Sequence, residues 1–167
     1  ARQVNFVWNY LNELSHRSIR ERGVFLSAYD LDRYTQGASK ELGLHSQTLQ
    51  EVSREYATRR RQFKKARLSW RKSIGVRRSL GWIPFKSGAA SWKNGQVFHN
   101  GRCFKVWDSY GLGQYRLRSG SFSEDARGRW YFNVVVELET QLSTGQGVVG
   151  IDLGLKDVAT CSDGQRL

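Results

Sequence analysis

The sequence predicts an α+β protein of 167 residues, with helices first and short strands after them. Two observations carry this prediction. Apolar residues recur at helical spacing in the first 70 residues or so, and glycine turns then separate short runs rich in β-branched and aromatic residues. We therefore expect a helical segment at residues 1–74, a small β-barrel at 75–146, and the opening strands of a further unit at 147–167.

Two long helices are expected in the first segment. Apolar residues recur every three or four positions from Val4 to Leu14, which indicates a helix near the N-terminus. Residues 27–43 are rich in Gly, Ser, Thr and Asp and are predicted to be a turn region. A second helix is expected to begin with Ser46 as its cap and to reach about residue 70. Its apolar stripe is predicted to consist of Leu49, Val52, Tyr56, Phe63, Ala66 and Trp70.

Short strands are expected after residue 74. The clearest runs from Trp130 to Leu138, where Asn133 and Glu137 are the only polar residues. Weaker candidates lie at residues 97–98, 103–107 and 114–118. Nine glycines between residues 75 and 128 break this part of the chain into short pieces, a texture that favours a small barrel or half-barrel.

Charge is the strongest bulk signal. Lys and Arg number 27 against 15 Asp and Glu, a formal net charge of +12. Residues 59–86 hold eleven basic side chains and no acidic one, so this stretch carries nearly all of the excess. Such a balance favours a polyanionic partner, most often nucleic acid.

The basic residues also follow the spacing of the predicted second helix. One helical face is expected to carry Arg60, Lys64, Arg67 and Arg71, with Arg61, Lys65 and Lys72 on the neighbouring strip and Arg77, Arg78 and Lys86 extending the patch. A solvated helix face usually mixes Glu with Lys for mutual support. No acid lies between Glu55 and Asp108, so we predict that these ten residues contact nucleic acid. Trp82, Phe85 and Trp92 lie among the cations and could stack on bases, although a place in the barrel core is the favoured interpretation.

Other classes of protein find little support. Cys103 and Cys161 are far apart and in no C-x-x-C pair, so neither a disulfide framework nor a cysteine zinc site is expected. No apolar run is long enough to span a membrane, and the chain opens at Ala1 with no apolar leader. We therefore expect a cytoplasmic protein without a membrane partner, trimmed at its start.

The last segment places one carboxylate in unusual surroundings. In a strand over residues 149–155, Gly150, Asp152 and Gly154 share one face, and the apolar residues share the other. Asp152 would then stand on a face stripped of side chains, with room for a metal ion and its phosphate. A return strand is expected at residues 158–161, closed by a turn at 162–164, and Asp157 is assigned a structural role.

These residues resemble a known family. The run V-G-I-D-L-G-L-K-D-V-A-T-C-S-D-G at residues 149–164 resembles the opening motif of the RuvC nuclease domain in TnpB-like proteins, transposon-encoded relatives of the type V CRISPR effectors. G-W-I-P-F-K-S at 81–87 is similar to the family's G-x-P-x-F-K element, with the Phe one residue early. The runs at 4–12, 44–52 and 127–137 resemble its recognition helices and the strand before the nuclease domain, in the family's order.

The resemblance implies the N-terminal part of an RNA-guided DNA endonuclease. Its fold would combine a helical recognition segment, a wedge-like β-barrel and the first hairpin of an RNase H-like nuclease domain. Guide RNA and target DNA would be the partners, together with the missing C-terminal half or a second copy. Asp152 would be a catalytic ligand of Mg²⁺, while the remaining carboxylates and a zinc ribbon would follow Leu167. On this interpretation the chain alone is inactive as a nuclease.

Three other interpretations stay open. The chain could be a guided DNA-binding protein whose nuclease is lost, or a plain basic RNA-binding module. More remotely, G-I-D-L-G at 150–154 also resembles the first phosphate loop of actin-like ATPases. Those proteins favour Thr or small polar residues where this chain has Leu155 and Lys156, and they carry the loop near the N-terminus.

Overall fold

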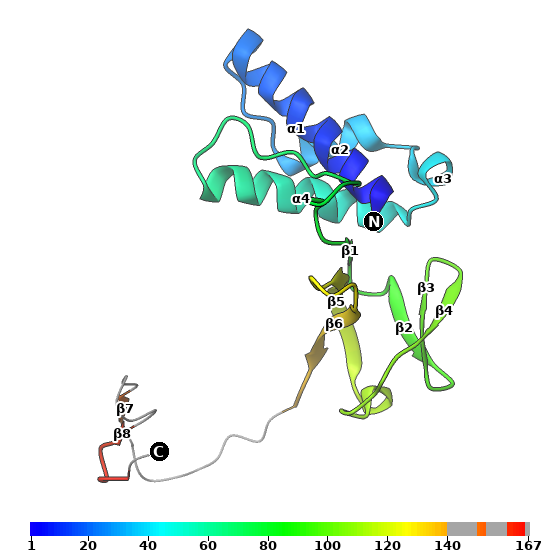
Figure 1. Ribbon diagram of the computed structural model, residues 1–167, viewed down its shortest axis with the longest axis vertical. Coiled ribbons are helices and arrows are strands. Elements are labelled where there is room, and N and C mark those ends of the chain that lie inside the picture. The colour runs from blue at the N-terminus through cyan, green and yellow to red at the C-terminus, as the bar shows by residue number, and fades with distance from the viewer. Residues whose placement is uncertain (140–149, 153–159, 166–167) are drawn as a thin grey trace.

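The computed structural model describes residues 1–139, 150–152 and 160–165. These residues form a mixed α+β structure, as the sequence predicts, in which four helices precede two three-stranded antiparallel sheets. The helices lie together in the upper part of Figure 1, and the sheets lie below them.

Helix α1 (Arg2–Arg22) confirms the first helical prediction. Val4, Val7 and Leu11 are at most 2% exposed and face the other helices, as their spacing requires. The helix ends at Gly23, whose φ of 68° is left-handed and therefore favours glycine. The N–H of Gly23 donates to the Ile19 carbonyl, which closes the last turn.

The prediction of a turn region at residues 27–43 is wrong, because two short helices lie there. These are α2 (Ala28–Thr35) and α3 (Ser39–Leu42). Ser27 and Asp30 form a capping box, in which each side chain accepts a backbone N–H of the other residue. Leu31 then packs fully buried against the core of the helical layer, so capping and burial together outweigh the polar composition.

Helix α4 (Ser46–Gln62) is shorter than predicted. It is capped by His45 rather than Ser46, and it ends at Gln62 instead of near residue 70. Its end has the hydrogen bonds of a Schellman motif: Lys64 N–H donates to the Arg61 carbonyl, and Lys65 N–H donates to the Arg60 carbonyl. Lys64 takes the left-handed conformation there, with φ 51°.

Like-charge repulsion opposes a longer helix. Continued as a helix, residues 60–71 would place cations at three- and four-residue steps without an acid between them, and such like-charge pairs are destabilising. The chain instead leaves the helix and returns across α1 and α4 before it enters the first sheet (Figure 1). We call residues 63–81 the connecting segment.

Three asparagines of α1 hold the connecting segment in place, and we call Asn5, Asn9 and Asn12 the asparagine ladder. The Asn12 amide donates to the Leu68 carbonyl (2.7 Å) and accepts the Leu68 N–H (2.9 Å). Asn9 binds the backbone of Arg71 in the same two-sided way, at 2.9 and 2.8 Å. Each amide thus replaces one rung of a β-ladder, and the segment needs no regular secondary structure of its own.

The strands form two separate sheets. In the first sheet β5 (Arg116–Glu124) lies between β1 (Trp82–Phe85) and β6 (Trp130–Glu137). The second consists of β2 (Ala90–Lys93), β3 (Gln96–His99) and β4 (Arg102–Lys105), in that order. The strands predicted at residues 97–98, 103–107 and 130–138 are therefore confirmed within a few residues. At residues 114–118 the prediction holds in part, because a 3₁₀ turn occupies Leu112–Gln114.

A closed barrel is not formed within the described residues. The two sheets share no hydrogen-bonded strand pair, and β2 packs on β5 through side chains. Phe85, Phe122 and Phe132 fill the space between them, with ring centroids 5.2–5.7 Å apart. The pairing of β5 with β6 is irregular near Gly120, where a Cβ atom would lie 2.1 Å from the Asn133 carbonyl oxygen. Only glycine allows that approach of the two backbones.

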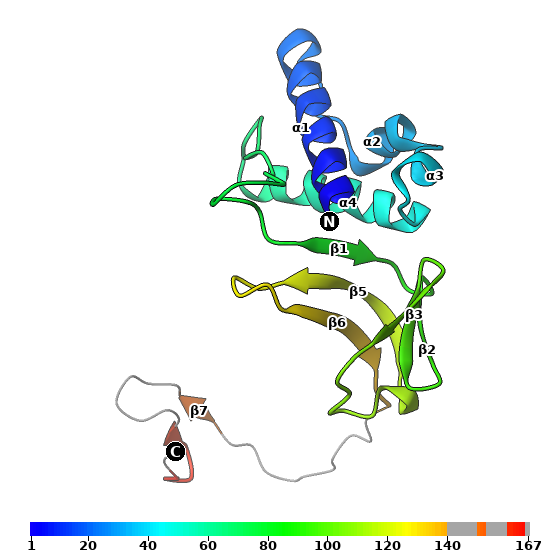
Figure 2. The same cartoon turned by 45° about the vertical axis from the view of Figure 1, so that its right-hand side comes forward.

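Strand β1 joins the helices to the first sheet. It lies between α4 and β5 in Figure 2, and Ile83 contacts the cores on both sides. The Trp82 ring meets Trp8 of α1 edge-on, with centroids 6.4 Å apart. This contact and Ile83 together form the apolar link between the helical layer and the sheet.

A short antiparallel pairing is described near the C-terminus. Strand β7 (Ile151–Asp152) pairs with β8 (Thr160–Cys161), with Asp152 opposite Thr160. A return strand beside Asp152 is thus present, closed by a turn in which Gly164 has a φ of 89°. The predicted glycine-flanked face reaches into residues 149 and 153–155, which lie outside the described residues.

Candidate nucleic-acid interface

The ten predicted basic residues do not share one helical face. Arg60 and Arg61 lie in the last turn of α4, Lys86 lies beyond β1, and the others belong to the connecting segment. Five of them are engaged by hydrogen bonds to protein groups. The other five are exposed and carry no ion pair in the described part of the chain, namely Arg61, Lys64, Lys65, Lys72 and Arg77.

Arg60 is buried, so the prediction that it points outward is wrong. Its side chain is 6% exposed and donates to the Ser15 hydroxyl and, at 2.6 Å, to the Leu26 carbonyl. The guanidinium also lies over the rings of Phe25 and Tyr56, at 5.4 and 5.9 Å from their centroids. Arg60 therefore ties α4 to α1 and to the loop before α2, because α4 turns this position inward.

Arg71 and Arg67 lie on the connecting segment and are partly engaged. The Arg71 guanidinium donates to the Asn5 carbonyl oxygen (2.6 Å) and to the Leu80 carbonyl (2.7 Å). Burial lowers the pKa of Arg71 below its ordinary value. Arg67 pairs with Glu13 at 3.1 Å while both side chains stay largely exposed. Such an exposed pair is weak, so Arg67 can exchange its partner for a phosphate at little cost.

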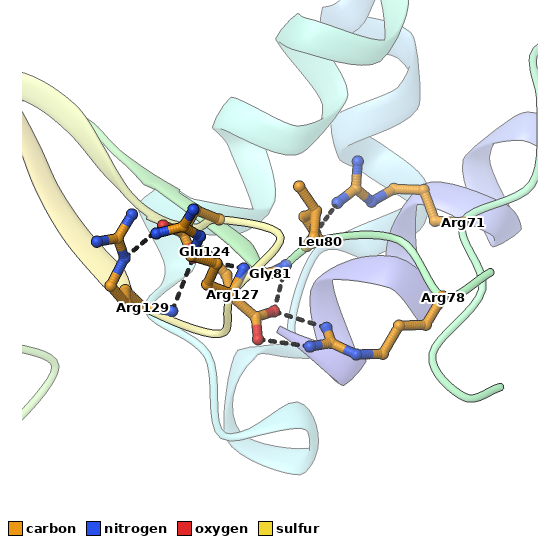
Figure 3. A network of polar contacts seen from close by, with 8 residues as sticks. Arg71, Arg78, Leu80, Gly81, Glu124, Arg127 and Arg129 are labelled. Atoms are coloured by element: carbon orange, nitrogen blue, oxygen red, sulfur yellow. Dashed lines mark hydrogen bonds and ion pairs between the residues drawn. The ribbon is translucent and has the colours of Figure 1, made fainter. Parts of the chain in front are cut away.

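A bidentate ion pair fastens the end of the connecting segment to the first sheet. Arg78 binds both carboxylate oxygens of Glu124, at 2.6 and 2.7 Å (Figure 3). The Gly81 N–H donates to the same carboxylate at 2.9 Å. These bonds hold the pKa of Glu124 down at about 2, from an ordinary value of 4.5. Arg78 is thus a structural residue, and Lys86 has a lesser contact, a 2.8 Å hydrogen bond to Gln50.

Of the ten residues predicted to contact nucleic acid, the five exposed cations are the ones that remain available to a ligand. They follow one another along the end of α4 and the connecting segment, whose backbone the asparagine ladder fixes. Cations held on a fixed backbone lose little further freedom when they meet a row of phosphates. The prediction that they contact nucleic acid stays a prediction.

An open cleft lies beside these cations. It has a volume of about 600 Å³ and lies between Trp8 of α1, the end of α4, the connecting segment and the start of β1. Its aromatic lining consists of Trp8, Phe63, Trp70 and Trp82. Its charged lining consists of Arg59, Lys65 and Arg71 against the single acid Glu55, so the cleft is aromatic and net positive.

A second hollow has a different character. It measures about 890 Å³ and is lined by β6 and by residues between 105 and 115, with Trp107 93% exposed. Its lining includes one cation, Lys105, and one acid, Asp108. Charge therefore distinguishes the two hollows, and the cleft beside the connecting segment is the one suited to a polyanion.

The three aromatic residues proposed from sequence take different positions. Phe85 is fully buried in the core between the sheets, and Trp92 packs against that core, which confirms the core interpretation for both. Trp82 is half-buried and lines the cleft. The cleft positions of Phe63 and Trp70 were missed, because both were assigned to a buried helical stripe, although they are 55% and 48% exposed.

The nuclease motif is described only in part. Asp152 lies in β7, and the prediction that it binds Mg²⁺ stays a prediction. Among the described residues, no three His, Cys, Asp or Glu side chains are grouped so that they could hold a metal ion. No helix in the described residues is long and apolar enough to cross a membrane.

Comparison with protein-family models and with curated proteins found no match to this sequence.

Neutralising the five exposed cations should weaken binding to a structured RNA. Replacing Arg61, Lys64, Lys65, Lys72 and Arg77 with Gln should reduce the slope of log affinity against log salt by about 0.7–0.9 for each phosphate that the variant no longer neutralises. Filter binding of one RNA hairpin at several salt concentrations measures this slope. The matched control changes Arg2, Arg17, Lys40, Arg102 and Arg127 to Gln, which removes the same charge elsewhere on the exposed surface. Equal reductions of the slope in both variants would show that net charge alone binds the RNA.

The ion pair of Glu124 predicts a stability that depends on pH. Because folding lowers the pKa of this carboxyl from 4.5 to about 2, the unfolded chain takes up the proton first as the pH falls. The contribution is complete above pH 4.5 and disappears between 4.5 and about 2. Urea unfolding of Glu124→Gln should therefore show a shallower decline of stability in this window than the unaltered chain. Glu41→Gln, which removes an exposed carboxylate of α3, should leave the decline unchanged.

Proposed function

We propose that this chain is the nucleic-acid-binding N-terminal part of a TnpB-like, RNA-guided DNA endonuclease. The observation that carries the proposal is the row of five exposed cations without acid partners in the described residues, beside an aromatic, net positive cleft. In such a protein this region would hold the guide RNA scaffold and the guide–target duplex, mostly through backbone phosphates.

The arrangement of acids supports a polyanionic ligand over a merely solvated surface. The acidic residues near the connecting segment are already engaged: Glu55 pairs with Arg59, Glu13 with Arg67 and Glu124 with Arg78. The exposed cations between these pairs repel one another in the free protein. A row of phosphates would remove that repulsion, which is the driving force that the proposal requires.

The family part of the proposal rests on the order of the motifs. The run at residues 149–164 follows a helical segment and a region of short strands, as it does in TnpB-like proteins. In a complete nuclease site, Asp152 would be one ligand of Mg²⁺, which would stabilise the charge that develops at the cleaved phosphate. One carboxylate does not make such a site, so we assign no cleavage step to this chain alone.

The RNA that accompanies the protein in its own cells tests the proposal. After purification from the native source at moderate salt, sequencing of the bound RNA should yield one structured RNA encoded next to the protein's own gene. The five-cation Gln variant should release this RNA, and its matched control should keep it. A broad mixture of cellular RNA would contradict the guided-nuclease proposal and leave a general basic RNA-binding module.

A further inference from the structure

The cleft beside the connecting segment has the dimensions of a ligand site. Its volume of about 600 Å³ lies inside the range of about 300–1,000 Å³ that is usual for small-molecule pockets. Its walls come from parts of the chain that the asparagine ladder and the Arg78–Glu124 pair hold together. The cleft is therefore a fixed feature of the fold.

Two aromatic side chains of the cleft, Phe63 and Trp70, are exposed. Phe63 is 55% exposed and Trp70 is 48% exposed, whereas Trp8 and Leu68 in the same lining are at most 9% exposed. The Arg67 guanidinium lies over the Trp70 ring at 5.4 Å from its centroid. Burying such rings against another flat apolar surface would be favourable. We therefore look for a ligand that carries a flat apolar group.

The charges of the cleft lining indicate which chemical groups the ligand should carry. Glu55 is neutralised by Arg59 at 2.6 Å, which leaves Lys65 and Arg71 as the net charge of the lining. Arg71 is engaged by Asn5 and Leu80, but Lys65 is exposed and makes no ion pair in the described residues. The ligand should therefore combine a flat ring with a negative group.

We propose that the cleft binds one unpaired nucleotide, with its base against Trp70 and Phe63 and its phosphate against Lys65. The inference rests on the proposed nucleic-acid binding and adds that the bound nucleotide is unpaired. A base inside a duplex already has both faces stacked and its edge paired, so it cannot offer a face to the two rings. An unpaired base in a bulge, loop or strand end can leave its stack and enter the cleft.

The cleft also distinguishes this ligand from two others. A polyanion recognised by phosphate alone would need the exposed cations but not the aromatic lining. An apolar peptide would use the aromatic lining but would leave Lys65 and Arg71 desolvated beside it. A nucleotide uses both parts of the lining.

A pair of RNA hairpins of equal length tests the proposal. One hairpin is fully paired and the other has a single-nucleotide bulge. We expect the chain to bind the bulged hairpin about tenfold more tightly, the scale of one stacked base. Changing both Phe63 and Trp70 to Leu should abolish this preference and leave affinity for the paired hairpin within about twofold. Trp107→Leu, at a 93% exposed position outside the cleft, should keep the preference.

The outcomes separate this inference from the proposed function. Equal affinity of the unaltered chain for both hairpins, with normal salt dependence, would overturn the inference and leave nucleic-acid binding intact. Binding to neither hairpin would overturn both. Bulged DNA hairpins in parallel decide whether the nucleotide is RNA or DNA.

A crosslinking measurement tests the site without any variant. A 5-iodouridine in the bulge should crosslink to Phe63 or Trp70, identified by mass spectrometry. Crosslinks confined to Trp107 or Tyr110 would place the base in the other hollow and overturn the inference.

Discussion

Asn12 and Asn9 bind the backbone of Leu68 and Arg71, and these hydrogen bonds set the path of the whole connecting segment. Without them, the connecting segment with its seven cations would have neither a helix nor a strand to order it. The two amides satisfy the backbone groups that a helix or sheet would otherwise satisfy. Asn12 is fully buried and also accepts the Tyr56 hydroxyl, so this anchor lies within the core of the helical layer.

The division of the cations into engaged and exposed side chains follows from the same hydrogen bonds. The ladder turns Arg71 toward Asn5 and the tryptophans, and the segment then ends at the Arg78–Glu124 pair. Arg71 and Arg78 thus join the helices to the sheet, and Lys72 and Arg77, which lie between them in the sequence, remain exposed. One basic stretch thus supplies both internal ties and a row of exposed cations, the surface proposed to bind a polyanion, and composition alone cannot say which residue does which.

The parts of the fold that the sequence predicted are those with a strong period. Helix α1, with Val4, Val7 and Leu11, and strand β6 each have a clear apolar pattern and lie where expected. The end of α4 was missed because the apolar and basic residues continue at helical spacing past Gln62, while the competing hydrogen bonds come from Asn9 and Asn12, more than fifty positions away. Such a long-range competitor leaves little local signal, although asparagines at positions 5, 9 and 12 of one helix face were an available hint.

Site prediction failed for a related reason. Arg60 was assigned outward from the apolar stripe of a straight helix, but the stripe was set partly by Phe63 and Trp70, which are not in the helix. With those two removed, Leu49, Val52 and Tyr56 define the buried face, and Arg60, four residues after Tyr56, belongs to it. The exposure of Phe63 and Trp70 could be seen only once the helix end was known.

The affinity of Asn9→Ala for a structured RNA shows whether the fixed path of the connecting segment matters for binding, because this change leaves the net charge untouched. The Asn9 side chain bonds to the backbone of Arg71, so its removal should loosen the connecting segment. If the fixed path of the segment positions the cations, affinity should fall at least about threefold through the added cost of ordering it. Gln3→Ala, an exposed change on the same helix, should have no effect. Unchanged affinity in Asn9→Ala would contradict the account and would mean that the cations bind RNA wherever the segment lies.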